Sequence, residues 1–256
     1  MVRCWKWSEE DLVKAELDTP VISPGRRLDP EWLDELPPED PRAVGSRKDL
    51  RRLNRIMSHV PFLADVWRRN RPDRWIETIV ELGAGDGTFL LEFARAVAPS
   101  SRPYRVILVD RLKAVPPQTL DEFHALGWTA NFVQADVFEW LRSCEVSAAA
   151  FVANLFLHHF EEERLRLLLE GIASRANLFI ALEPRRCLRG VLASHLVGLI
   201  GCNPVTRHDA VASVHAGFKG KELSALWPGR GWYTQETEIG RFSHCFSAFS
   251  SVPRTS

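Results

Sequence analysis

The chain lacks the patterns that mark several classes of protein. Its 256 residues include five scattered cysteines, with no CxxC pair and no Cys and His grouping at zinc spacing. We therefore expect reduced thiols, no bound metal and a cytoplasmic protein. The longest mostly apolar run, residues 190–202, is interrupted by His195, and the first residues have no apolar signal segment. Stable membrane insertion is not expected.

An excess of charge of one sign is also absent. Lys and Arg together number 33, and so do Asp and Glu, which gives a net charge of zero. A general nucleic-acid binder relies on long-range attraction to phosphates, which this balance does not supply. We expect a small-molecule partner and no nucleic acid. The 45% of hydrophobic residues, with nine tryptophans, is enough to form a sizeable core.

The pattern of the chain changes near residue 75. Pro and Asp recur through residues 18–46, which predicts short helical turns joined by irregular chain. From Ser46, a helix is predicted that Pro61 ends or kinks, with arginines on one face. Its other face would carry an apolar stripe: Leu50, Leu53, Ile56, Met57 and Val60. We expect residues 1–75 to form an N-terminal helical cap and residues 76–256 the main domain, with a helical insertion at about 185–230.

After residue 74, short apolar runs alternate with amphipathic helices. Five of these runs are predicted strands: residues 75–82, 104–110, 129–136, 148–156 and 177–184. Strands separated by helices in this way predict a parallel sheet with helices on both faces. Two further strand-like runs, residues 232–240 and 242–250, are joined by a short turn and predict a terminal hairpin.

The stretch ELGAGDG, residues 81–87, follows the first predicted strand and precedes a helix that starts near Thr88. Ligands of open parallel sheets bind beyond the carboxyl ends of the strands. Gly83 is expected to make the sharp turn, while Gly85 and Gly87 allow the backbone to approach a ligand. The spacing fits a dinucleotide fingerprint poorly because Thr88 occupies its last position, and no P-loop follows. A glycine-rich turn without a ligand is the alternative.

Two carboxylates follow the next two predicted strands. Asp110 ends the second strand and can accept hydrogen bonds from both hydroxyls of a ribose. Asp136 ends the third strand and can accept one from an adenine amino group. Either acid alone would serve equally well as a strand-end cap. Together with the glycine turn, they predict a pocket for adenosine without a pyrophosphate.

Four segments, VELGAGDGTFLLEFA, VILVD, QADVFEW and NLFLHHF, resemble the successive motifs of class I S-adenosylmethionine-dependent methyltransferases. The resemblance implies an α/β, Rossmann-like, doubly wound and mostly parallel seven-stranded sheet with strand order 3-2-1-4-5-7-6. It implies S-adenosyl-L-methionine as the cofactor and a set of residues that would bind it. In that set Glu81, Gly83, Gly85 and Gly87 line the methionine half, Asp110 holds the ribose, Asp136 and Val137 meet the adenine, and Asn154 lies beside them.

The segment after the fourth strand bears on the acceptor. Methyltransferases that act on nucleobase or amide nitrogen usually carry Asn-Pro-Pro-Tyr there, whereas this chain has Asn154 followed by Leu155 and Phe156. The motif LHH and residues 204–226 resemble bacterial methyltransferases that tailor polyketides and quinones. This resemblance implies a small aromatic, phenolic or quinone-like acceptor in secondary metabolism, methylated at oxygen. The segment ALEPRR departs from the Asp-Leu-Arg expected after the fifth strand.

Three histidines are candidate general bases, a role that contributes roughly 10²–10⁴-fold. His158 and His159 lie beside the predicted cofactor pocket, and His208 precedes Asp209. The first pair could equally be first-turn residues bonded to backbone, and His208 a surface helix cap. A non-catalytic binding or scaffold protein with this fold is the alternative function, and a nicotinamide oxidoreductase is disfavoured by Thr88. Either a monomer or a homodimer is compatible with the sequence.

Overall fold

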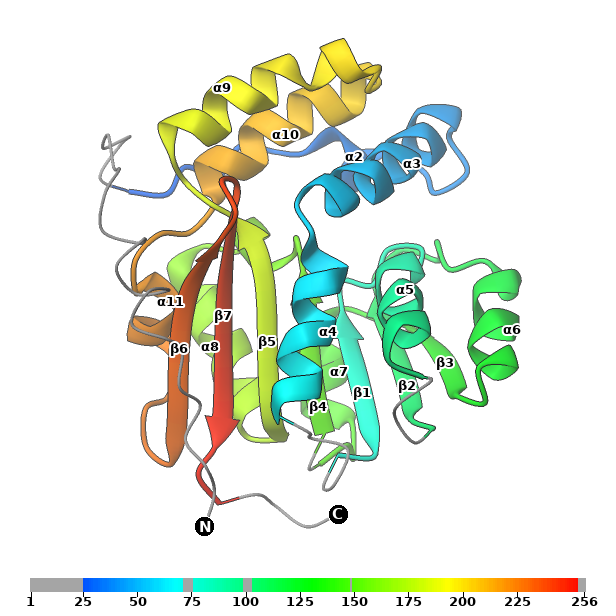
Figure 1. Ribbon diagram of the computed structural model, residues 1–256, viewed down its shortest axis with the longest axis vertical. Coiled ribbons are helices and arrows are strands. Elements are labelled where there is room, and N and C mark those ends of the chain that lie inside the picture. The colour runs from blue at the N-terminus through cyan, green and yellow to red at the C-terminus, as the bar shows by residue number, and fades with distance from the viewer. Residues whose placement is uncertain (1–24, 71–75, 99–102, 148, 253–256) are drawn as a thin grey trace.

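The computed structural model describes residues 25–70, 76–98, 103–147 and 149–252. Its centre is a seven-stranded sheet with the order β3-β2-β1-β4-β5-β7-β6 (Figure 1). The strands are β1 (Thr78–Leu82), β2 (Arg105–Asp110), β3 (Thr129–Gln134), β4 (Ala149–Asn154), β5 (Ala176–Pro184), β6 (Trp232–Ile239) and β7 (Ser243–Ser250). Strands β1 to β5 run parallel, and β7 pairs antiparallel with both β5 and β6. The predicted fold and strand order are confirmed.

Helices cover both faces of the sheet. One face packs against α4 (His59–Asn70), α5 (Thr88–Val97) and α6 (Pro117–Ala125). The other packs against α7 (Val137–Ser143), α8 (Glu162–Ala173) and α11 (Glu222–Leu226). Side chains of a strand point alternately to the two faces, so Val106 and Leu108 of β2 join the first core and Ile107 and Val109 the second. The central strands are therefore buried on both sides, as their apolar sequences predict, whereas the edge strands β3 and β6 are partly exposed.

A further group of helices lies beyond the carboxyl ends of the parallel strands, at the top of Figure 1. It consists of α2 (Trp32–Glu35), α3 (Pro41–Ile56), α9 (Leu188–Leu196) and α10 (Pro204–Ala216), with the short turn η4 (Val197–Ile200) between the last two. We call these helices the roof. They come from two separate parts of the chain, one before β1 and one between β5 and β6. Within the described residues, no helix is long and apolar enough to cross a membrane.

Helix α3 differs from its predicted form in two ways. It begins at Pro41, with Asp40 capping it, and Ile56 of the predicted apolar stripe is 58% exposed. Asp49 is buried instead and accepts hydrogen bonds from the Asn203 amide (2.8 Å) and the Thr206 hydroxyl (3.1 Å). This face of α3 meets α10 through polar bonds, which a search for apolar spacing does not detect.

Pro61 does not end a helix. The chain breaks earlier, at Ser58 with φ of 58°, and α4 then starts at His59 with Pro61 in its first turn. Amides of a first turn have no partner within the helix, so a proline is tolerated there. The prediction of a helix end at Pro61 was wrong by one turn. The predictions for residues 1–24, including Cys4, lie outside the described residues; Cys144, Cys187, Cys202 and Cys245 are free thiols.

Candidate active site

A cavity of about 790 Å³ lies where the carboxyl ends of the parallel strands meet the roof. Its floor includes Gly83, Gly85, Asp110 and Asn154, which follow or end β1, β2 and β4. Its other walls come from residues 28–34, from α3, and from the turn η3 (Leu157–His159). Pockets of roughly 300–1,000 Å³ are typical of small-molecule sites. The cavity is thus at the predicted edge of the sheet and of a suitable size.

The three glycines of the loop after β1 have left-handed backbone conformations but different surroundings. A Cβ on Gly83 would lie 2.2 Å from Cδ2 of Phe156, and one on Gly87 would lie 2.8 Å from Cδ1 of Leu108. A Cβ on Gly85 would meet nothing within 4 Å, because this glycine faces the cavity. Gly87 is the N-cap of α5 and does not line the cavity. The prediction that Gly87 approaches a ligand is therefore corrected: its missing side chain lets helix and strand pack closely.

Asp110 is held at the cavity edge by two backbone donors. The Gly85 amide donates to Oδ2 and the Leu112 amide to Oδ1, each at 2.8 Å. Burial raises the pKa of Asp110, although both amide bonds oppose this change. Each carboxylate oxygen can accept more than one hydrogen bond, so both remain able to bind two neighbouring hydroxyls. The side chain is oriented before any ligand arrives.

Glu81 is a buried carboxyl at the base of the cavity, only 2% exposed. Its Oε2 has no hydrogen-bond partner among the residues that the structure describes. Burial, with the nearby charges of Asp86 and Asp110, raises the pKa of Glu81 well above its usual value. A buried acceptor without a partner is costly, and a positively charged ligand would satisfy it. Glu81 therefore fits the cationic methionine half of S-adenosylmethionine.

The remaining predicted cofactor residues also line the cavity. Asp136 accepts bonds from the Phe138 and Glu139 amides through one oxygen, Oδ1, at 2.8 and 3.3 Å, and so caps α7. Val137 is the first residue of that helix and is buried. Asn154 ends β4 and faces both the cavity and His59. Helix α7 was not predicted from the sequence, because the carboxylate of Asp136, which caps this short helix, was interpreted as a group that binds adenine.

His59 holds Asn154 in place. Its Nδ1 is 2.7 Å from Oδ1 of Asn154, and its Nε2 is 2.6 Å from the Ser243 hydroxyl. Burial lowers the pKa of His59 to about 4, although the Asn154 bond opposes the change. The ring is therefore neutral in the folded protein at neutral pH. It links α4 to the ends of β4 and β7.

We expect the free energy of unfolding to fall as the pH is lowered from about 6.5 towards 4. The unfolded chain protonates His59 near pH 6.5, whereas the folded protein does so only near pH 4. At about pH 5 this difference amounts to roughly 2 kcal/mol, since one pKa unit corresponds to about 1.4 kcal/mol. Urea unfolding of the wild type and of His59→Gln at several pH values isolates this contribution. Equal pH slopes for the two proteins would contradict it.

His158 lies between two carboxylates. Its Nδ1 is 2.7 Å from Oε2 of Glu183, and its Nε2 is 3.2 Å from Oε1 of Glu31. Burial lowers the pKa of His158, but the two hydrogen bonds outweigh it and raise the pKa to about 9. At neutral pH both ring nitrogens then carry protons and donate. This arrangement does not suit a general base, which must begin with a free nitrogen.

The two partners of His158 are themselves fixed. Burial raises the pKa of Glu31, but bonds from His158 and Ser213 and the charge of His159 outweigh it and lower the pKa to about 2. Glu183 is completely buried, and its Oε1 accepts from the Phe156 and Leu157 amides at 3.0 and 2.8 Å. The carboxylate at the end of β5 thus shapes the turn that carries both histidines.

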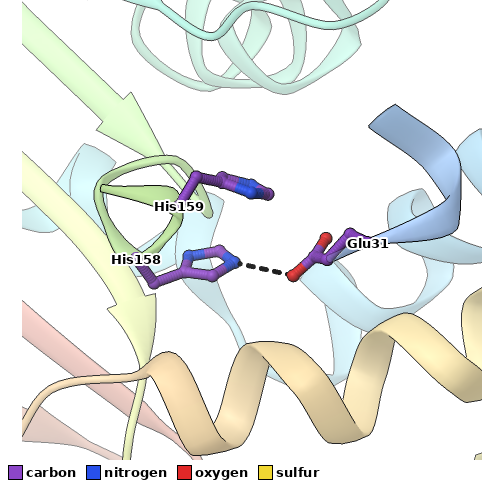
Figure 2. A group of neighbouring side chains, drawn as sticks. All are labelled: Glu31, His158 and His159. Carbon is purple, nitrogen blue, oxygen red and sulfur yellow. Dashed lines mark hydrogen bonds and ion pairs between the residues drawn. The ribbon is translucent and has the colours of Figure 1, made fainter. Parts of the chain in front are cut away.

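His159 is the more accessible of the two neighbours. Its side chain is 23% exposed, and its Nδ1 lies 3.6 Å from Oδ2 of Asp34. The rings of His158 and His159 are 4.3 Å apart between centroids. Figure 2 shows both rings on the turn η3, facing Glu31, which projects from the segment just before α2. The cavity therefore has a cluster of two imidazoles and a carboxylate in its wall.

His208 is not part of the cavity wall. Its ring stacks on Trp32 with centroids 4.0 Å apart, and its Nδ1 is 2.9 Å from Oδ1 of Asp209. The Asp209 carboxylate also accepts from the Trp32 and Leu33 amides, at 2.8 and 3.0 Å, and so anchors the start of α2. The prediction of a base at His208 is corrected: the pair joins two helices of the roof.

Several residues of the site were not predicted from the sequence. Glu31 and Asp34 fall in the Pro-rich segment, where nothing in the spacing points to the histidines 127 positions later. Glu183 was visible as a departure, since ALEPRR has glutamate at a strand end, a position where functional groups gather. Arg51 of the arginine-rich face also reaches the site, with its Nη1 2.5 Å from Oδ2 of Asp86 in the glycine loop.

The chain resembles known methyltransferases in both sequence and structure. Residues 79–176 match the family described as methyltransferase domain. Among solved structures, one neighbour is an O-methyltransferase family protein from Burkholderia thailandensis. The match covers 84% of this chain and 63% of the neighbour's chain, with 19% identity and a TM-score of 0.55. The match to the plantazolicin methyltransferase covers 86% of this chain and 93% of that protein's chain, with 9% identity and a TM-score of 0.59. The match to magnesium protoporphyrin IX methyltransferase from Synechocystis PCC 6803 covers 80% of this chain and 84% of that protein's chain, with 14% identity and a TM-score of 0.53.

These likenesses place the chain in a known fold. At such identities the structural matches show the fold alone, and comparison with curated proteins gave no match. The chain spans only 60% and 63% of the length of two O-methyltransferase structures that it matches. Residues 79–176 match a methyltransferase domain, and the seven-stranded sheet that contains them has the fold of the methyltransferase structures that it resembles. Such a domain implies S-adenosylmethionine as its cofactor, as the sequence predicted.

Proposed function

We propose that this protein is a cytoplasmic enzyme that transfers the methyl group of S-adenosylmethionine to an oxygen of a small aromatic, phenolic or quinone-like acceptor. One observation carries the proposal: the residues suited to the cofactor line one part of a cavity of about 790 Å³, and residues from the roof line another part of it. Phe156 and Phe160 line this cavity as well. A covered pocket with aromatic walls suits a small acceptor better than a macromolecule.

Six of the eight predicted cofactor residues have a direct role in this proposal. Asp110 binds the ribose hydroxyls, Glu81 pairs with the charged methionine half, and Gly85 allows close approach to the backbone. Asp136 and Val137 border the adenine. Asn154, which His59 orients, lies between the cofactor and the acceptor. The roof helices would cover the acceptor, as expected of the N-terminal cap and of the insertion after β5.

Bound S-adenosylmethionine supplies an electrophilic methyl group on a sulfonium centre. The protein must hold the acceptor oxygen in line with it, and such positioning contributes roughly 7–11 kcal/mol to a reaction of this kind. The acceptor must also lose a proton. His158 is already protonated, so it orients neighbouring groups through its charge. Of the three predicted bases, only His159 both lines the cavity and has a partly exposed ring. We therefore propose that the acceptor binds beside His159.

Titration calorimetry with S-adenosylhomocysteine tests the proposal most directly. We expect binding in the micromolar range, with no heat of binding from NADH under the same conditions. After binding is shown, phenolic and quinone acceptors can be screened by mass spectrometry for the gain of one methyl group. If S-adenosylhomocysteine does not bind, the glycine loop is a structural turn and the scaffold alternative becomes the better description.

A further inference from the structure

The wall of the cavity contains a compact group of two imidazoles and one carboxylate. Glu31, His158 and His159 each offer one ligand atom, and these atoms all lie within 4.8 Å of one another. All three residues line the cavity (Figure 2). Three protein ligands with a position left open is the arrangement of catalytic divalent metal sites.

We propose that Glu31, His158 and His159 bind a divalent transition-metal ion, with Zn²⁺ the best fit, in the wall of this cavity. Imidazole and carboxylate together suit Zn²⁺ and its first-row neighbours better than Mg²⁺ or Ca²⁺, which prefer oxygen ligands. Ligand atoms on a tetrahedral ion at about 2.1 Å lie about 3.4 Å apart. Pairs now within 4.8 Å would have to close by no more than about 1.4 Å, which side-chain rotation can provide.

The surroundings of His158 give independent support. Metal-binding histidines usually donate their second ring N–H to a carboxylate, which fixes the tautomer and strengthens the ligand. Glu183, fully buried, accepts from Nδ1 of His158 at 2.7 Å and leaves Nε2 directed at Glu31. Two backbone amides bind the other oxygen of Glu183 and prevent it from turning away. Glu183 and these two amides therefore hold His158, the candidate metal ligand, in position before an ion binds.

The neighbourhood of the site is also favourable. Oδ2 of Asp34 lies 3.6 Å from Nδ1 of His159, which is an ion-pair distance slightly longer than a hydrogen bond. Ser213 donates to Oε1 of Glu31 at 2.5 Å and holds that carboxylate in place. When the ion binds, the proton that now joins Nε2 of His158 to Glu31 is released to solvent, so charge and atoms balance. The expectation of no bound metal rested on Cys and His spacing, which does not bring residue 31 together with residues 158 and 159.

If the proposed function holds, the ion would lie on the acceptor side of the same cavity. A cation there would favour the deprotonated form of an acceptor hydroxyl, which is the form that attacks the methyl group. This role rests on the proposed function, whereas the metal site does not. Metal binding and cofactor binding can therefore be measured separately.

The test is a calorimetric titration of Zn²⁺ into the full chain after removal of metal by a chelator, with Mg²⁺ as a comparison. We expect one equivalent of Zn²⁺ to bind in the micromolar range or tighter, and Mg²⁺ to bind far more weakly. Glu31→Gln and His159→Ala should each weaken Zn²⁺ binding by at least about tenfold, the lower limit seen even for changes in outer-layer partners. His195→Ala, an exposed histidine on α9, is the matched control and should bind as the wild type does.

The outcomes separate the two proposals. The metal site is overturned if the wild type binds no Zn²⁺ in this range, or if both site variants keep wild-type affinity. Because His159 is partly exposed, its alanine variant should fold, and thermal unfolding checks this for both site variants. S-adenosylhomocysteine binding without Zn²⁺ binding would leave the methyltransferase proposal intact. Zn²⁺ binding without S-adenosylhomocysteine binding would leave only the metal site.

Discussion

Asp110→Ala is expected to weaken S-adenosylhomocysteine binding by about tenfold to somewhat more than 100-fold. A hydrogen bond to a charged group contributes roughly 1.5–3 kcal/mol, and each 1.4 kcal/mol corresponds to about a factor of ten in affinity. The Gly85 and Leu112 amides already orient this carboxylate, so the ligand does not have to order it. Titration calorimetry of the wild type and the variant measures the difference.

Two further variants make the Asp110 result interpretable. Asp110→Asn keeps the shape and one carbonyl oxygen, and it should fall between the wild type and the alanine variant. Asp121→Ala removes an exposed carboxylate from α6 and should leave affinity unchanged. An unaltered dissociation constant for Asp110→Ala would remove this residue from the ribose and with it the main support for the orientation of the cofactor.

Alanine at Gly83 and at Gly85 should damage the protein in different ways. Gly83→Ala places a methyl group 2.2 Å from the Phe156 ring in addition to a left-handed backbone, so we expect a loss of stability above roughly 2 kcal/mol. Gly85→Ala meets no protein atom within 4 Å and should cost only the roughly 1–2 kcal/mol of the backbone conformation. Its methyl group enters the cavity, however, and should weaken S-adenosylhomocysteine binding by at least about tenfold.

Gly240 provides a matched control for this comparison. Its φ of 56° nearly equals the 55° of Gly85, a Cβ there would also meet nothing within 4 Å, and it does not line the cavity. Gly240→Ala should therefore lose as much stability as Gly85→Ala but keep full affinity for S-adenosylhomocysteine. Thermal unfolding and calorimetry of the three variants together test the assignment. If Gly85→Ala binds as tightly as Gly240→Ala does, the ligand does not approach this part of the loop.

The parallel core of the fold could be predicted from the sequence because its signals are local. Each strand is a short apolar run, and α8 carries Leu165, Leu168, Leu169 and Ile172 on one buried face, as its spacing predicts. The strand order depends on pairing between distant segments, and it was available only through the resemblance to a known family. The start of α5 at Thr88 was also predictable, because this residue directly follows Gly87, the last glycine of the loop.

The candidate site was only partly predictable, for a physical reason. Asp110 ends β2 and Gly85 lies three residues after β1, so sequence position determines where they lie. The partners of His158 come from the segment before α2 and from the end of β5, and only the folded roof brings Glu31 to it. The role of Gly87 was also misjudged, because close packing against Leu108 and exposure to a ligand both require glycine. A sequence alone does not distinguish these two requirements.

The anchoring of α2 by Asp209 couples two distant parts of the chain. The first amides of this short helix are bound by a carboxylate on α10, and the stack of Trp32 on His208 joins the same two helices. A four-residue helix has too few internal bonds to persist alone. Helix α2 therefore depends on α10 to hold its position beside the cavity, so the two separate parts of the chain that form the roof are coupled at this point.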